Sequence, residues 1–173
     1  MVMLRFHAKP DFIPRTSGAA SILPRCVRAV PAQAELLSRI AVAAKQHWRY
    51  PREWMDEWRS DLTLTAEYIQ KHETYIAMHS QRAVGFAAWE RLGEDAVLEH
   101  CWVLPEMLGR GMGSALFACY ERAARTAGAK RLRIVADPHA EPFYHRMGAH
   151  TVSRQRTEVG REERWLPVLE KKL

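Results

Sequence analysis

Cysteine is scarce in this chain, and its spacing excludes the sites that cysteines usually build. The 173 residues include 3 cysteines, Cys26, Cys101 and Cys119, with no Cys-x-x-Cys pair. An odd number without that spacing argues against a disulfide framework or a zinc site, and fits a reducing compartment. The histidines form no pair four residues apart on a predicted helix, so we infer no metal. We expect a cytoplasmic protein without a metal ion.

Long apolar runs and dense basic runs are also missing. No apolar run approaches the ~20 residues that span a membrane, so no membrane partner is expected. The net charge of +6 allows anionic ligands. However, the chain has no basic run interleaved with aromatics and no zinc-finger or RNP-type pattern, which makes nucleic acid the least favoured partner. Internal repeats and low-complexity segments are absent.

The length suits one domain that buries a substantial core. Residues 1–24 contain proline, serine and glycine, and no continuous signal-peptide core. We expect them to form a loose, poorly ordered leader, followed by one domain over residues 25–173.

The most informative stretch is a strand, a glycine loop and a helix in succession. The apolar run over residues 97–103 predicts a buried strand, which Pro105 ends. Gly109-Arg110-Gly111-Met112-Gly113-Ser114 then opens directly into an amphipathic helix that Gly128 closes. Glycines allow close backbone approach, and the first N–H groups of a helix have no intrahelical partner, so this geometry favours phosphate binding. The alternative is a tight turn that binds nothing, because short glycine patterns also recur by chance.

The remaining segments predict a mixed α/β sheet with helices on both faces. Pro31 suits the first position of a helix, Thr65 suits an N-cap, and Pro142 and Gly148 bracket a short helix. The expected elements are strands over 25–30, 74–78, 83–91 and 131–136, helices over 32–46, 52–59 and 66–71, and two strands within 149–169 around Gly160.

Two motifs in this order resemble those of the GNAT family of acyl-CoA-dependent N-acetyltransferases. They are Val103-x-Pro105 followed by the glycine loop, and Ala140-x-x-Phe143-Tyr144-x-x-x-Gly148 after a strand. The resemblance covers about residues 25–155. One position departs from the family pattern, because Leu108 stands where the family has glutamine or arginine.

The resemblance implies a twisted, mostly antiparallel sheet of six to seven strands, flanked by helices and splayed between strands 97–103 and 131–136. Acetyl-CoA would lie in the opening, with its pantetheine along the exposed strand edge. Backbone groups of Trp102, Val103 and Leu104 would hold the pantetheine. The pyrophosphate would lie on the N–H groups of Gly109, Arg110, Gly111, Met112, Gly113 and Ser114. Asp137 stands where the family has a pantetheine-binding asparagine, and His139 is an alternative donor.

The chemistry requires two proton movements. An amine with a pKa near ~10 must lose a proton before it attacks the thioester, and the departing thiolate benefits from one. Tyr144 matches the general-acid tyrosine of the family, although without the resemblance it would be a packing tyrosine. For the base we favour Glu99, because a carboxylate inside an apolar run is costly unless it faces a wet cleft or a partner.

Several alternatives remain for the base and for the function. Glu99 could instead pair with an arginine, and Glu90 or a water chain could take the proton, whereas strand alternation puts His100 on the opposite face. The predicted function is direct transfer of an acetyl group from acetyl-CoA to a primary amine of a small molecule or peptide. Leu108 and Asp137 motivate the alternative of a catalytically silent acyl-CoA-binding module.

The acceptor pocket is expected around residues 47–58 and 155–164. Aromatic residues in the first of these segments serve either as a lid over the sheet or as a pocket wall. Carboxylates at Glu53, Asp56 and Glu57 could attract a cationic amine, or they could form a solvated helix face. The exposed edge of the final strands makes a homodimer credible.

Overall fold

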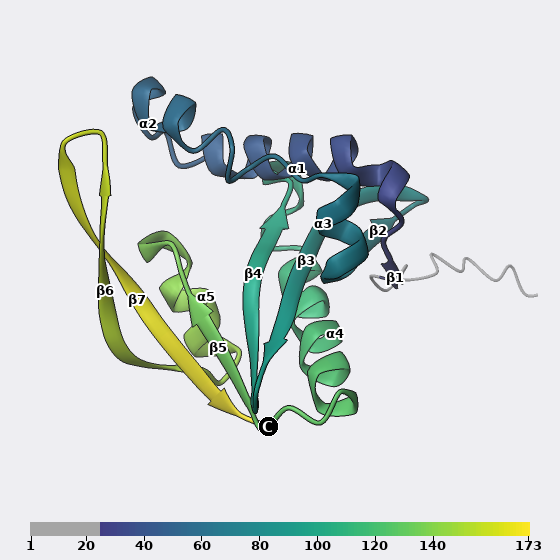
Figure 1. Cartoon of the computed structure of the whole chain (residues 1–173). Helices are drawn as coiled ribbons and strands as arrows, with labels where there is room; N and C mark the ends of the chain where they lie inside the picture. The colour runs from purple at the N-terminus through teal and green to yellow at the C-terminus, as the bar shows by residue number, and fades with distance from the viewer. Residues whose placement is uncertain (1–24) are drawn as a thin grey trace, which may run out of the picture.

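The computed structural model describes residues 25–173, which fold around a seven-stranded sheet in the order β1-β2-β3-β4-β5-β7-β6 (Figure 1). The strands are β1 (Arg25–Arg28), β2 (Glu73–His79), β3 (Arg82–Leu92), β4 (Asp95–Val103), β5 (Arg131–Val135), β6 (His150–Val159) and β7 (Glu162–Lys172). All neighbouring strands are antiparallel except β4 and β5. The predicted sheet of six to seven mostly antiparallel strands is therefore confirmed. The expected leader lies outside the described residues.

The helices begin and end close to the predicted positions. They are α1 (Ala34–Gln46), α2 (Arg52–Glu57), α3 (Ala66–Lys71), α4 (Met112–Thr126) and α5 (Glu141–Arg146), with 3₁₀ turns at Pro31–Gln33, Pro105–Met107 and Pro138–Ala140. Thr65 caps α3, because its hydroxyl accepts a hydrogen bond from the Tyr68 N–H at 3.0 Å. Gly128 and Gly148 adopt φ values of 77° and 85° just past α4 and α5, as helix-ending glycines do. No helix within residues 25–173 combines the length and apolarity needed to cross a membrane.

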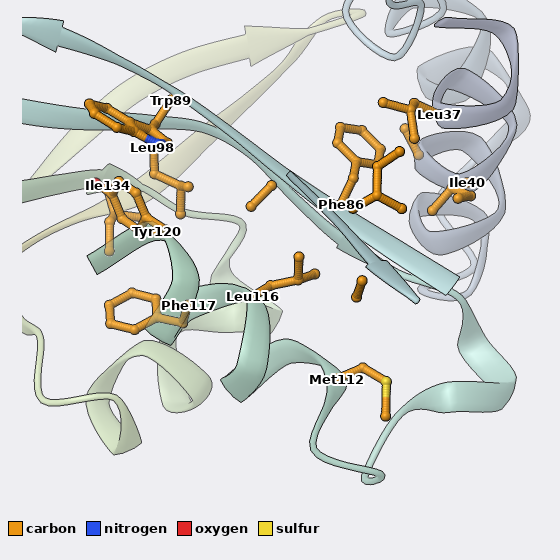
Figure 2. Close-up of a cluster of buried hydrophobic side chains, with 14 of the residues drawn as sticks. Leu37, Ile40, Phe86, Trp89, Leu98, Met112, Leu116, Phe117, Tyr120 and Ile134 are labelled. Atoms are coloured by element: carbon orange, nitrogen blue, oxygen red, sulfur yellow. The ribbon is translucent and has the colours of Figure 1, made fainter. Parts of the chain in front are cut away.

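The core lies on both faces of the central strands. Phe86 of β3 is fully buried and lies toward Leu37 and Ile40 of α1 (Figure 2). On the opposite face α4 packs so closely that a Cβ on Gly85 would lie 3.2 Å from Leu116 and 2.6 Å from the Trp102 carbonyl oxygen. Only glycine fits there. The expectation of helices on both faces is therefore confirmed.

β4 and β5 form the splayed pair that the family resemblance implies. Their parallel pairing runs from Asp95 opposite Arg131 to Leu98 opposite Ile134 and then stops. Figure 1 shows the two strands diverging beyond that point. The edge of β4 from Glu99 onward therefore has no strand partner on the β5 side, which leaves an opening in the middle of the sheet.

The β6–β7 hairpin extends from the sheet toward α2 (Figure 1). At its tip the Gly160 N–H donates a hydrogen bond to the Glu57 carboxylate at 2.6 Å, and Trp54 lies against the same glycine. The hairpin and α2 are therefore in direct contact. β6 is one of the two edge strands of the sheet, and the homodimer predicted through the edge of the final strands stays a prediction.

Candidate active site

The opening between β4 and β5 leads into a cleft of about 1000 Å³, the upper end of the range for small-molecule sites. The cleft brings most of the predicted site residues together. Those that line it are Glu99, Trp102, Val103, Gly109, Gly111, Gly113, Ser114, Asp137, His139 and Tyr144. Leu104 and Met112 are buried and Arg110 is exposed, outside the lining. Leu104 also donates its N–H to the Val84 carbonyl at 2.8 Å, so this N–H is not available to pantetheine.

The glycine loop presents free backbone donors to the cleft. Gly109 and Gly111 adopt φ values of 73° and 78°, a region that glycine enters readily. Within α4 the first hydrogen bond runs from the Ala115 N–H to the Gly111 carbonyl, which leaves the earlier N–H groups of the helix without intrahelical acceptors. The Arg110 N–H instead donates to the Met107 carbonyl at 3.3 Å. The donors able to meet an anion are therefore those of Gly109 and of residues 111–114, a narrower set than predicted.

A β-bulge in β4 sets the direction of Glu99. Ala88 pairs with His100 and Trp89 pairs with Leu98, so Glu99 has no partner on β3. The extra residue breaks the alternation of side chains. Leu98 and His100 pair with adjacent residues of β3, whose side chains alternate, so these two side chains lie on opposite faces although they are two positions apart. His100 packs against Tyr68 and Phe86, with ring centroids 5.4 and 5.8 Å apart. Strict alternation therefore does not hold here, and the expectation that it puts His100 on the opposite face from Glu99 loses its basis.

The electrostatic environments of Glu99 and His100 give them different roles. Partial burial, followed by the charge of Glu90, raises the pKa of the Glu99 carboxyl, while His72 opposes the shift. Burial lowers the pKa of His100 to about 4, and its Nδ1 accepts a hydrogen bond from Trp102 Nε1 at 3.0 Å. His100 is thus a neutral, weak base near pH 7, whereas the pKa of Glu99 is shifted toward the range of a useful proton acceptor.

The alternatives for Glu99 are less consistent with the geometry. No arginine lies within 4.0 Å of its carboxylate anywhere in residues 25–173. Glu90 is outside the cleft lining and lies 4.0 Å from His72 Nε2. Glu99 is therefore the carboxylate that the bulge directs into the cleft.

Tyr144 lies beside the opening, on α5. Its side chain is buried, with 6% of the residue exposed, and it contacts the aromatic side chains of Phe117 and Phe143. Burial, followed by interaction with the neighbouring Cys101, raises the pKa of the Tyr144 hydroxyl well above its usual range. Tyr144 therefore keeps its proton at neutral pH and can donate it in a hydrogen bond.

Asp137 lies at the centre of a cluster of buried charges that the sequence did not predict. Its carboxylate accepts hydrogen bonds from Lys45 Nζ at 2.7 Å and from the Tyr50 hydroxyl at 2.8 Å, and it lies 3.7 Å from Arg164. The His139 N–H also donates to it at 3.1 Å, and the His139 ring stacks on Trp48. The Asp137 oxygens already have protein partners, which weakens its predicted contact with pantetheine.

One sequence signal for this cluster existed. Lys45 follows Leu37 by eight residues and Ala41 by four, so it lies on the apolar face of α1, where a lysine needs a partner. Arg164 is far away in the chain, and nothing local in the sequence marks it.

The three carboxylates of α2 lie outside the cleft lining. Asp56 contacts Arg52 and Arg59, and Glu57 accepts the hydrogen bond from Gly160. These contacts favour the interpretation that the three carboxylates form a solvated helix face, and not a site that attracts a cationic amine. Within residues 25–173 no three His, Cys, Asp or Glu side chains gather as a metal site would require.

Comparison with known proteins agrees with this arrangement. The model of the acetyltransferase (GNAT) domain family matches residues 37–162. No curated protein sequence matches the chain. Among solved structures, a GCN5-related N-acetyltransferase from Rhodopseudomonas palustris is similar, with 23% identity, a TM-score of 0.72, and coverage of 87% of this chain and 96% of the other.

Two further structures share the fold at lower identity. The PaiA N-acetyltransferase from Thermoplasma acidophilum, in complex with coenzyme A, has 17% identity, a TM-score of 0.71 and coverage of 87% of this chain and 99% of that one. A GNAT-family acetyltransferase from Staphylococcus aureus has 15% identity, a TM-score of 0.67 and the same coverage values. At these identities the structures establish the fold alone.

The fold is therefore that of the GNAT acetyltransferases, and the cleft lies where its two central strands part. Because the family model spans most of the chain, the protein belongs to the GNAT acetyltransferase family.

Proposed function

We propose that this protein transfers the acetyl group of acetyl-CoA directly to a primary amine. The observation that carries the proposal is that three structural features meet at one point of the sheet. β4 and β5 part after Leu98, the bulge directs Glu99 into the gap, and Tyr144 is buried beside it. The free N–H groups of the glycine loop lie in the same cleft, where they would bind the pyrophosphate.

In this proposal the two proton movements fall to different residues. Glu99, directly or through water, accepts the proton of the incoming ammonium, and the free amine attacks the thioester carbon. Tyr144 donates a hydrogen bond to the sulfur as the carbon–sulfur bond breaks. Because its pKa is raised above that of a thiol, Tyr144 stabilises the thiolate mainly by hydrogen bonding.

The cysteines favour direct attack over an acyl-enzyme. Cys101 lies in the cleft, but burial raises the pKa of its thiol to about 12, so it is a neutral and poor nucleophile. The thiol of Cys119 has a pKa lowered to about 7, first by a hydrogen bond with Cys26, but it lies outside the cleft lining.

Replacing Glu99 with glutamine is expected to lower kcat/KM about 100-fold near neutral pH. A raised carboxyl pKa means that the base is protonated in acid and becomes active as the pH rises. The wild type should therefore show an acid limb in its pH–rate profile, and Glu99→Gln should remove it. An acid limb of unchanged position in the variant would exclude Glu99 as the base.

Replacing Tyr144 with phenylalanine is expected to lower kcat about 10- to 100-fold, because one hydrogen bond to a charged group contributes about 1.5–3 kcal/mol. The ring keeps its packing, so the affinity for acetyl-CoA should change little. Steady-state kinetics and a calorimetric titration measure the two quantities on the same sample. Wild-type kcat in the variant would contradict this role of Tyr144.

A calorimetric titration with acetyl-CoA, followed by an amine screen, tests the function as a whole. Micromolar binding, about −8 kcal/mol, is expected, together with acetylation of at least one primary amine. Binding without turnover of any amine would instead favour the silent acyl-CoA-binding module that Leu108 and Asp137 suggested. A cytoplasmic location stays a prediction.

A further inference from the structure

The charged cluster around Asp137 contains more positive than negative charge. Lys45 and Arg164 both contact this one carboxylate, and the exposed fractions of the Lys45, Arg164 and Asp137 side chains are only 10%, 12% and 13%. Burial, followed by Asp137, raises the pKa of the Tyr50 hydroxyl, so Tyr50 stays neutral. Burial lowers the pKa of the Lys45 ammonium, and the charge and hydrogen bond of Asp137 oppose that shift. With Lys45 protonated beside Asp137, the cluster carries one uncompensated positive charge with little access to bulk water.

Arg164 is the cation that has unused hydrogen-bond donors. Its guanidinium lies over the rings of Tyr50, Trp54 and Trp58, with its central carbon 5.0–5.3 Å from their centroids. A guanidinium has five N–H donors. Within residues 25–173 its one hydrogen-bond acceptor is the Tyr50 hydroxyl, at 3.1 Å, and its closest approach to Asp137 is 3.7 Å. Arg164 lines the cleft, so the remaining donors have an approach route for a ligand.

The two ends of this part of the cleft carry opposite charges. Lys45 Nζ lies 6.0 Å from the Trp102 ring, at the cationic end. Glu99 precedes Trp102 by three residues on β4, or roughly 10 Å along a strand. Trp58 and Trp102 line the cleft with these groups, so an apolar spacer has aromatic surfaces to contact.

We propose that the acceptor is an amine that also carries a carboxylate, separated from the amine by a spacer of several bonds. The amine lies at the Glu99 end, and the carboxylate lies at Arg164 and Lys45. A planar carboxylate matches the fork of an arginine, which can donate two parallel hydrogen bonds to it. This inference rests on the proposed function, because it identifies the substrate class of the same site.

A matched series of acceptors tests the proposal. The ω-amino carboxylates γ-aminobutyrate, δ-aminovalerate and ε-aminocaproate are compared with n-butylamine, n-pentylamine and n-hexylamine, which present the same ammonium without the carboxylate. We expect kcat/KM for the best amino carboxylate to exceed that of its partner amine at least tenfold, as one charge-assisted hydrogen bond would give. O-phosphoethanolamine and ethanolamine form a further pair that tests for a phosphate.

Arg164→Gln should remove this preference. We expect the loss of kcat/KM to be about tenfold larger for the amino carboxylate than for the n-alkylamine of the same length. Arg156→Gln is the matched control, because Arg156 lies in the same hairpin, contacts Glu158 and Glu163 and is outside the cleft lining. Arg164→Lys, which keeps the charge but not the fork, should fall between wild type and Arg164→Gln and serves if the glutamine variant does not fold.

Three results would overturn the proposal. They are equal kcat/KM for the two acceptor series, an equal loss for both in Arg164→Gln, and a preference for O-phosphoethanolamine over every amino carboxylate. If the n-alkylamines are acetylated but the carboxylates gain nothing, the proposed function stands and this inference fails. If acetyl-CoA binds and no amine is acetylated, the proposed function itself fails.

Discussion

Replacing Asp137 with asparagine is expected to lower the free energy of unfolding by about 3 kcal/mol at neutral pH. The change keeps the shape of the side chain but removes the one carboxylate that contacts Lys45 and Arg164, both nearly buried. Two buried cations would then face each other without a counter-charge. The expected fall in Tm is about 6–12 °C for a chain of this length, measurable by calorimetry or circular dichroism.

The double variant Lys45→Met with Asp137→Asn is the critical control. It removes one charge of each sign, so the cluster keeps the net charge of the wild type and should regain most of the lost stability. Asp56→Asn tests a surface carboxylate, whose contacts with Arg52 and Arg59 are exposed, and should cost less than about 1 kcal/mol. A Tm for Asp137→Asn equal to that of Asp56→Asn would contradict the importance of the buried cluster.

The stability that Asp137→Asn loses relative to the wild type is expected to depend on pH in a defined direction. Burial opposes ionisation of Asp137, but Lys45, Tyr50 and the His139 N–H outweigh it and lower the pKa of the carboxyl. A lowered pKa in the folded state contributes stability above the ordinary pKa of aspartate, and this contribution is lost as the pH falls through the folded-state value. The difference in stability between wild type and Asp137→Asn should therefore be full at neutral pH and shrink in acid.

The elements that depend on local sequence were predictable. Periodicity and turn residues are local signals, so a single segment is enough to predict the apolar run of β4, the glycine loop or the apolar face of α4. The family resemblance added the splay between β4 and β5 and the position of Tyr144. Both follow from motifs in a fixed order, and the structure confirms the splay.

The features that the sequence did not predict depend on pairing between distant segments. The bulge at Glu99 is a property of the register between β3 and β4, and alternation along one strand cannot reveal it. The cluster of Lys45, Asp137 and Arg164 joins α1, the end of β5 and β7. Lys45 alone carries a sequence signal, its position on the apolar face of α1, and that signal does not identify its partners. The surplus charge emerges only from the contacts among the three residues.

These distant contacts also connect stability with specificity. Asp137 contacts both Lys45 and Arg164 within the cleft and offsets part of their charge. If the charges of both cations were fully neutralised, no positive charge would remain to bind an anionic acceptor. If Asp137 were missing, two unpaired buried charges would remain. An arrangement of one carboxylate between two cations lies between these two extremes. It keeps the fold stable and leaves one positive charge for the ligand.

Replacing Gly111 with leucine is expected to weaken acetyl-CoA binding at least about 100-fold. The residue has a φ of 78°, and a Cβ there would meet no protein atom within 4 Å, so a larger side chain would extend into the open space beside the free N–H groups. Hydrogen bonds from backbone N–H groups to a charged phosphate contribute about 1.5–3 kcal/mol each, so loss of two accounts for this factor. A calorimetric titration with acetyl-CoA measures the change.

Gly93→Leu separates this effect from backbone strain. Gly93 has a φ of 61° in the turn between β3 and β4, has no atom within 4 Å of its Cβ position and lies outside the cleft lining. A non-glycine residue in the left-handed region costs about 1–2 kcal/mol at either position, so both variants should lose similar stability. Gly93→Leu should nevertheless bind acetyl-CoA like the wild type. Equal affinities in the two variants would mean that the phosphates lie elsewhere, since only Gly111 adjoins the N–H groups proposed to hold them.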